Sequence, residues 1–183
     1  MKKFLSLLLA MLMLLGCVAF AESEGDSAAD SAATAAVEIK LGQVQWAAHG
    51  TKCFAVMTVA LQGDVIVAAL IDEYQVGSGM VGVPNSENGF GGFAEGTVLY
   101  SKRVNAAAYS NNMATKAGST VALDVNYDLI QDFCVGKTVA ELEAAIAAFN
   151  GDTQAAIDAV TGATLVDTLG YLEGLLAAAK AAQ

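Results

Sequence analysis

Two apolar runs joined by a short polar turn constrain the fold of this chain more than any other feature. The runs cover residues 52–61 and 65–74, both rich in β-branched and other apolar side chains, with Gln62-Gly63-Asp64 between them. Short runs of this composition around a glycine-containing turn are typical of a β-hairpin. Both runs are apolar at alternate and at intervening positions. We therefore expect a sheet that is covered on both faces, or one whose second face is shielded by helices.

The first half of the domain is predicted to be a sheet. Further short strands are expected at 44–48 and 97–100. Residues 75–96 contain seven glycines and are interpreted as a long loop, a feature that is usually functional or mobile in a compact domain.

The second half is predicted to be helical. Thr138-Val139-Ala140-Glu141 is a capping box, which predicts a helix ending at Asn150-Gly151. Other helices are expected at 105–117, 127–134 and 153–159. A last helix is indicated by an apolar stripe, with two glycines that permit close packing: Leu165, Leu169, Leu172 and Leu176, and Gly170 and Gly174. The fold class is therefore α+β, a single domain with a mostly antiparallel sheet followed by helices.

The first 36 residues are predicted to lie outside this domain. Lys2 and Lys3 precede an apolar run, which is typical of a secretory signal peptide at 1–21. Ala19-Phe20-Ala21 predicts cleavage after Ala21 and release, whereas Leu14-Leu15-Gly16-Cys17 resembles a lipobox that would make Cys17 the acylated residue of an anchored lipoprotein. Both alternatives place the protein outside the cytoplasm. Residues 22–36 are small and acidic, and we expect a disordered spacer before a domain at 37–183.

Charge and cysteine content limit the partners. The formal net charge of −10 argues against binding of nucleic acid through a basic face. Cys53 and Cys134 both have apolar neighbours, so a disulfide and two buried free thiols are both compatible with the sequence. The chain has no C-x-x-C pair, so neither a redox dithiol nor a zinc site is indicated.

The segment Asp158-Ala159-Val160-Thr161-Gly162-Ala163-Thr164 has the most specific pattern in the chain. A helix-forming run follows it, so the Thr164 hydroxyl is expected in the first turn of the last helix. The unpaired N–H groups and the macrodipole at a helix N-terminus favour a phosphate there, and Gly162 and Ala163 leave the approach open. On these grounds alone, a glycine-containing helix cap without a ligand is the simpler interpretation.

This segment resembles the flavinylation motif of the FMN-binding domain family, which includes exported subunits of sodium-pumping NADH:quinone oxidoreductase and related electron-transport complexes. In that family a flavin transferase moves FMN from FAD to the last threonine of the motif as a phosphoester. The resemblance implies that Thr164 carries covalent FMN as cofactor. It also makes Asp158, Thr161, Gly162 and Ala163 the other motif positions.

Residues outside the motif give weaker indications of a flavin site. Val166 stands where the family usually has a second Ser or Thr. Lys102-Arg103 is interpreted either as a phosphate ligand or as a solvated pair at a strand end. His49, the only histidine, is interpreted as structural or exposed. Candidate ring partners in the glycine-rich loop, each with an ordinary loop role as the alternative, are Phe90, Phe93, Asn85 and Asn88.

The resemblance implies an extracytoplasmic electron carrier whose partners are a flavin transferase and membrane or exported redox proteins. No set of residues resembles an acid–base pair or a nucleophile–base couple, which favours a carrier over an independent enzyme. Two alternatives stay open. One is a secreted, non-redox binding module in which Thr164 is an unmodified cap, and the other is a small flavin-dependent reductase.

Overall fold

The computed structural model describes residues 37–86 and 93–183, which lie in one compact unit spanning residues 36–183. The expected signal peptide and spacer, and the ring candidates Asn88 and Phe90, lie outside the described residues. None of the described helices is long and apolar enough to cross a membrane.

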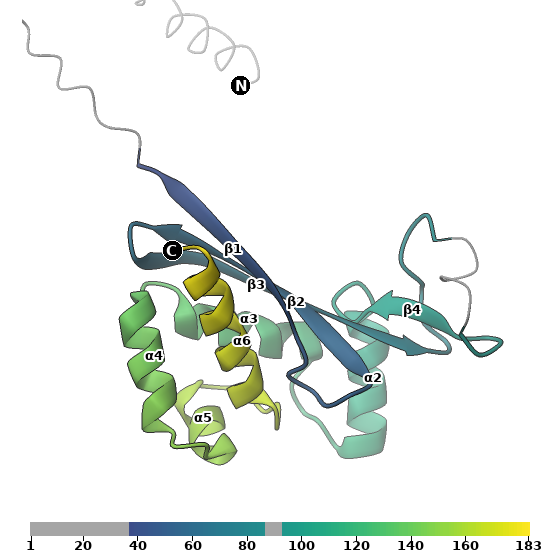
Figure 1. The fold of residues 1–183 in the computed structure, drawn as a ribbon. Helices are drawn as coiled ribbons and strands as arrows, with labels where there is room; N and C mark the ends of the chain where they lie inside the picture. The colour runs from purple at the N-terminus through teal and green to yellow at the C-terminus, as the bar shows by residue number, and fades with distance from the viewer. Residues whose placement is uncertain (1–36, 87–92) are drawn as a thin grey trace, which may run out of the picture. The chain divides into compact units, whose positions relative to one another are not determined.

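The described strands form an antiparallel sheet in the order β1-β2-β3-β4 (Figure 1). Their bounds are β1 (Ile39–Trp46), β2 (Cys53–Gln62), β3 (Val65–Gly77) and β4 (Val98–Ser101). The predicted hairpin is confirmed, because β2 and β3 pair and Gln62 lies opposite Val65. Gly63 has a φ of 64° in the turn, a left-handed conformation that glycine adopts without strain.

The helices follow the sheet in the chain, which confirms the α+β prediction. They are α2 (Ala106–Ala117), α3 (Leu123–Cys134), α4 (Val139–Ala148), α5 (Thr153–Ala159) and α6 (Thr168–Ala181). α3 begins four residues before the expected position, and α6 begins after Leu165, so Leu165 is not part of the helical stripe. Within α6, Leu175 is fully buried and Leu176 is only partly buried.

The described helices cover one face of the sheet, and Figure 1 shows them gathered on one side of the strands. Inward-facing β2 side chains such as Met57 and Val59 are fully buried. The intervening side chains of β2 and its neighbours are half-buried or exposed, including Phe54, Leu41 and Leu70. The expectation of two covered faces is therefore wrong. The additional apolar residues lie on an open face, where Phe54 stacks on Tyr74 with ring centroids 5.7 Å apart.

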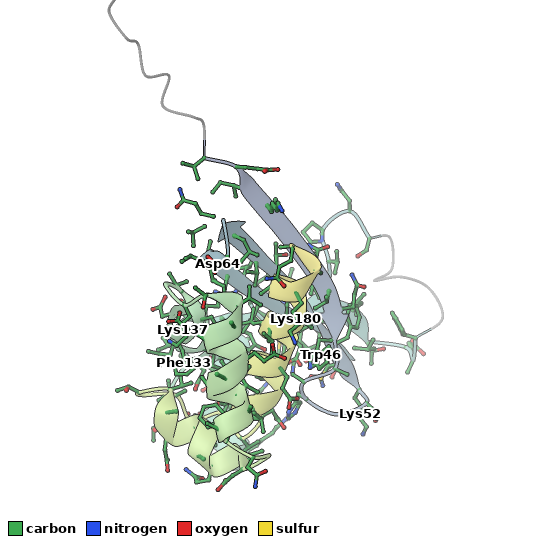
Figure 2. The ribbon with its side chains drawn as sticks, turned by 60° about the vertical axis from the view of Figure 1, so that its left-hand side comes forward. Trp46, Lys52, Asp64, Phe133, Lys137 and Lys180 are labelled. Atoms are coloured by element: carbon green, nitrogen blue, oxygen red, sulfur yellow. The ribbon has the colours of Figure 1, made fainter. Side chains whose placement is uncertain are left out.

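α6 lies very close to β1 and β2 because three glycines remove side chains from the contact. A Cβ atom at Gly42 would overlap the backbone of Ala178. A Cβ atom at Gly174 would lie 2.8 Å from the indole ring of Trp46, which Figure 2 shows beside α6. The expected close packing at Gly170 and Gly174 is confirmed, since a Cβ at Gly170 would meet Ala48 at 3.0 Å.

The capping box at the start of α4 is confirmed. The Thr138 hydroxyl accepts from the Glu141 N–H at 3.1 Å, and the Thr138 N–H donates to the Glu141 carboxylate at 2.8 Å. The N–H of Val139 donates to the carbonyl of Asp64, which ties α4 to the hairpin turn. Before the cap, Lys137 lies over the ring of Phe133, 4.1 Å from its centroid (Figure 2).

Candidate functional site

A pocket of about 700 Å³ lies among the described residues. This volume is in the range of small-molecule sites. Its wall is assembled from the β1–β2 connection, the ends of β3 and β4, helix α2, and the loop that precedes α6.

The wall combines aromatic and thioether side chains with cationic groups. The first group comprises Tyr100, Tyr109, Tyr171, Met80 and Met113; the second comprises Lys102 and Lys116, and His49 also lines the pocket. The Tyr100 and Tyr109 ring centroids are 6.4 Å apart. Asp167 is the only carboxylate among the lining residues that the structure describes. This chemistry suits a flat, largely apolar ligand that also bears negative charge.

Thr164 lines the pocket from the loop between α5 and α6, and its side chain is exposed. Its N–H donates to Asn126 Oδ1 at 2.7 Å, and its hydroxyl lies 3.4 Å from the same oxygen. The expectation that Thr164 lies in the first turn of the last helix is wrong. α6 begins at Thr168, because the N–H and the hydroxyl of that residue both donate to the carbonyl of Leu165.

The other motif positions are near Thr164 in the chain but do not line the pocket in the described structure. Asp158 is exposed on α5 and accepts from Gln154 at 2.8 Å, and Thr161 is also exposed. Gly162 has a φ of 89°, and the N–H of Ala163 closes a turn onto the carbonyl of Val160 at 2.9 Å. Of the five predicted site residues, Gly162 and Ala163 therefore shape the turn before Thr164, and only Thr164 lines the pocket.

The basic pair Lys102-Arg103 has a different environment from either expectation. The Lys102 side chain is 2% exposed and pairs with the buried Glu73, so the interpretation as a solvated pair is wrong. Arg103 donates to the carbonyl of Ile71 at 2.9 Å and pairs with Asp128. Only Lys102 of the two lines the pocket.

Glu73 is the centre of a buried polar cluster beneath the pocket. Its Oε2 accepts from Lys102 and from the hydroxyls of Tyr127 and Tyr171, at 3.1 and 3.0 Å. Its Oε1 has no hydrogen-bond partner among the described residues. Burial raises the pKa of both tyrosines and the nearby carboxylate raises it further, so the two hydroxyls stay protonated donors.

His49 has a partner that the sequence did not indicate. Its Nδ1 pairs with the carboxylate of Asp167, the residue that precedes α6. This pair joins the segment between β1 and β2 to the loop that contains Thr164, and both residues line the pocket. His49 is about half exposed, in agreement with the sequence interpretation.

The loop candidates for ring contacts are not supported by the described residues. Phe93 is 42% exposed and does not line the pocket. Asn85 lies in a turn with a φ of 58° and does not line the pocket. The ring-contact role is available instead to the tyrosines and methionines of the wall.

Both described cysteines are free and buried, which selects the thiol alternative over the disulfide. Burial raises the pKa of Cys53 to about 11, with a further contribution from Glu73. Burial raises the pKa of Cys134 to about 12. The described residues contain no cluster of His, Cys, Asp and Glu side chains that could hold a metal ion.

Comparisons of this chain with protein-family models, with curated proteins and with solved structures found no match. The function is therefore inferred from the motif and from the pocket that Thr164 lines.

Proposed function

We propose that this protein is an extracytoplasmic electron carrier that holds FMN as a phosphoester of Thr164. The observation that carries the proposal is the position of Thr164. It is the one motif residue that lines the 700 Å³ pocket, and its side chain is exposed to an incoming transferase. A phosphate on this oxygen would leave the rest of FMN beside the tyrosine and methionine wall.

The chemistry of the wall supports the same ligand. Aromatic and thioether side chains favour a flat ring system by stacking and by soft contacts. Lys102 and Lys116 are sources of positive charge on the same pocket as Thr164. These residues therefore fit a nucleotide that is apolar at one end and anionic at the other.

The proposed role of carrier follows from the chemistry that a bound FMN would supply. A bound flavin accepts and releases electrons, and the protein supplies binding, orientation and electrostatics. Attachment through a covalent bond prevents loss of the cofactor outside the cell. Flavin transferase and membrane or exported redox proteins are the partners that this role requires.

The test is co-production of the domain with a flavin transferase and FAD as donor. Transfer forms the bond from Thr164 Oγ1 to phosphorus, releases AMP, and loses the hydroxyl proton. We expect a yellow protein whose intact mass exceeds that of the bare chain by one FMN less one water. Thr164→Val keeps the shape of the side chain and should abolish the mass increase.

Thr120→Val is the matched control, because Thr120 also lines the pocket and is exposed but lies outside the motif. It should retain full attachment. A colourless wild-type protein of unmodified mass, made beside a transferase that labels another substrate, would instead favour the binding-module alternative. In that alternative, Thr164 only ties its loop to Asn126.

A further inference from the structure

The most unusual buried group that the carrier role does not by itself explain is the ammonium of Lys102. It lines the pocket, although its side chain is only 2% exposed. It pairs with Glu73, lies 4.8 Å from the centroid of the Tyr109 ring and contacts Cys53 Sγ at 3.8 Å. Glu73 is 0% exposed and does not line the pocket.

We propose that Lys102 stabilises the negative charge that a flavin ring in this pocket gains on reduction, and that it thereby raises the midpoint potential of the carrier. The inference rests on the proposed function, since it concerns the same pocket. It assigns a specific electrostatic role to a residue outside the attachment motif.

The charge on Lys102 is held in place by its surroundings. Burial lowers the pKa of this amine, but the Glu73 carboxylate and Tyr109 together raise it, and the net pKa lies above its usual value. The hydroxyls of Tyr127 and Tyr171 donate to the same oxygen of the Glu73 carboxylate and hold it in place. Of the ion pair only Lys102 lines the pocket, so its positive member is the nearer to a ligand there, in an environment where charges interact strongly.

The need for such a group follows from the net charge of the chain. When a flavin here takes up two electrons and one proton from a reductase, its ring carries one more negative charge than before. A chain with a formal net charge of −10 opposes that change. A preorganised cation at the wall offsets this opposition and requires no rearrangement when the electrons arrive.

The test compares midpoint potentials of the flavinylated protein, measured by titration with dithionite against a reference dye. The site variant is Glu73→Gln with Lys102→Met, which removes both charges together and keeps the side-chain lengths. The glutamine oxygen can still accept from the two tyrosines, and its amide nitrogen takes the place of Oε1, which has no partner among the described residues. The matched control is Glu143→Gln with Lys180→Met, an exposed ion pair joining α4 and α6 (Lys180 is labelled in Figure 2).

We expect the site variant to favour the reduced flavin about tenfold less than the wild type, a fall of about 30 mV for a two-electron couple. The control should leave the potential unchanged. Glu73→Gln alone should shift the potential in the opposite direction when it is measured on the acid side of neutrality, where the buried Lys102 amine keeps its proton but lacks its negative partner. This second variant keeps the test informative if the double variant folds poorly, and circular dichroism of each variant reports on folding.

The outcomes separate the two proposals. Yellow variants whose potentials equal that of the wild type, or a site variant with a higher potential, would overturn the role of Lys102 and leave the carrier proposal standing. A wild-type protein that never acquires FMN would overturn the carrier proposal itself.

Discussion

Asn126 is the residue that holds Thr164 at the edge of the pocket. It is fully buried, and its Oδ1 accepts from the N–H of Thr164 at 2.7 Å. Its amide nitrogen donates to the carbonyls of Val121 and Ala122, at 3.3 and 3.0 Å. One side chain therefore joins the loop before α6 to the start of α3.

Replacing Asn126 with alanine should destabilise the fold. The change leaves a backbone N–H and two carbonyls without their side-chain partner, and it should lower the free energy of unfolding by about 1–3 kcal/mol. Urea denaturation followed by circular dichroism measures the change. Asn111→Ala is the control, because Asn111 is exposed on α2 and should alter stability by less than about 0.5 kcal/mol. Equal urea midpoints for Asn126→Ala and Asn111→Ala would show that the Asn126 side chain does not stabilise the fold in this way.

The sequence made Thr164 a candidate site residue but did not indicate its neighbours in the fold, for a physical reason. The motif is contiguous, so its spacing is visible along the chain. Asn126 is 38 residues away from Thr164, and His49 is 118 residues from Asp167. Contacts of this kind are made by the tertiary fold, and no local periodicity predicts them.

At the scale of elements, the packing of α6 on β1 depends on Gly42. This residue is buried on the covered face of β1, opposite Val59 of β2. The backbone of α6 occupies the space that a side chain would need. The helix that follows the Thr164 loop is therefore positioned by a direct backbone contact with the sheet.

Gly42→Ala should force α6 away from the sheet. The overlap is with backbone atoms of Ala178 and Ala182, which cannot rotate aside, so we expect a loss of about 1–3 kcal/mol or more. Thermal unfolding of the variant beside Gln45→Ala, an exposed position on the same strand, checks this. A melting temperature equal to that of the Gln45 variant would show that α6 can shift freely.

The capping box of α4 gives stability a dependence on pH. Its hydrogen bonds to Thr138 lower the pKa of Glu141 in the folded protein below the reference value of 4.5. The unfolded chain therefore binds this proton at a higher pH than the folded protein. The stabilisation by Glu141 is present above that reference value and is lost as the pH falls through the lower, folded pKa.

The corresponding experiment compares the wild type with Glu141→Gln in urea from neutral pH down to strongly acidic pH. The wild type should be the more stable protein at neutral pH, and the difference should shrink below about pH 4.5. Glu143→Gln, an exposed change two residues along the same helix, controls for general charge effects. A constant difference across the whole range would contradict the assignment.

Sequence patterns predicted the helices and strands well where the stabilising interactions are made between residues close together in the chain. The capping box located the start of α4, and the Gln62-Gly63-Asp64 turn located the hairpin. The start of α6 was misplaced, because the carbonyl of Leu165 and not a side-chain cap begins that helix. The open face of the sheet was also missed, since apolar residues on both sides of a strand do not reveal which side the helices cover.

At the scale of the whole molecule, the layers of helices and sheet separate apolar side chains that are buried in the core from apolar side chains that lie on the open face of the sheet. The helices and one sheet face enclose the core, and that core contains Cys134. The other sheet face is open to solvent. Cys53 lies on the edge of the core, 8% exposed, close to the Glu73–Lys102 pair. The reactivity of Cys134 therefore probes the interior of the core, and the reactivity of Cys53 probes its edge.

Thiol labelling should distinguish global from local opening. Protein produced from Glu22 onward contains two cysteines, Cys53 and Cys134, whose raised pKa values of about 11 and about 12 leave little thiolate at mildly alkaline pH. Burial also blocks the reagent, so we expect almost no rapid reaction with a disulfide reagent in the native state. Both thiols should react at once in concentrated guanidinium chloride, without added reductant.

Slow labelling of the native protein should be faster at Cys53, near the surface, than at Cys134, because labelling of Cys134 requires the helical layer to separate from the sheet. Cys53→Ala assigns the two phases, and denatured protein that shows no free thiol until it is reduced would prove a disulfide and contradict the structure.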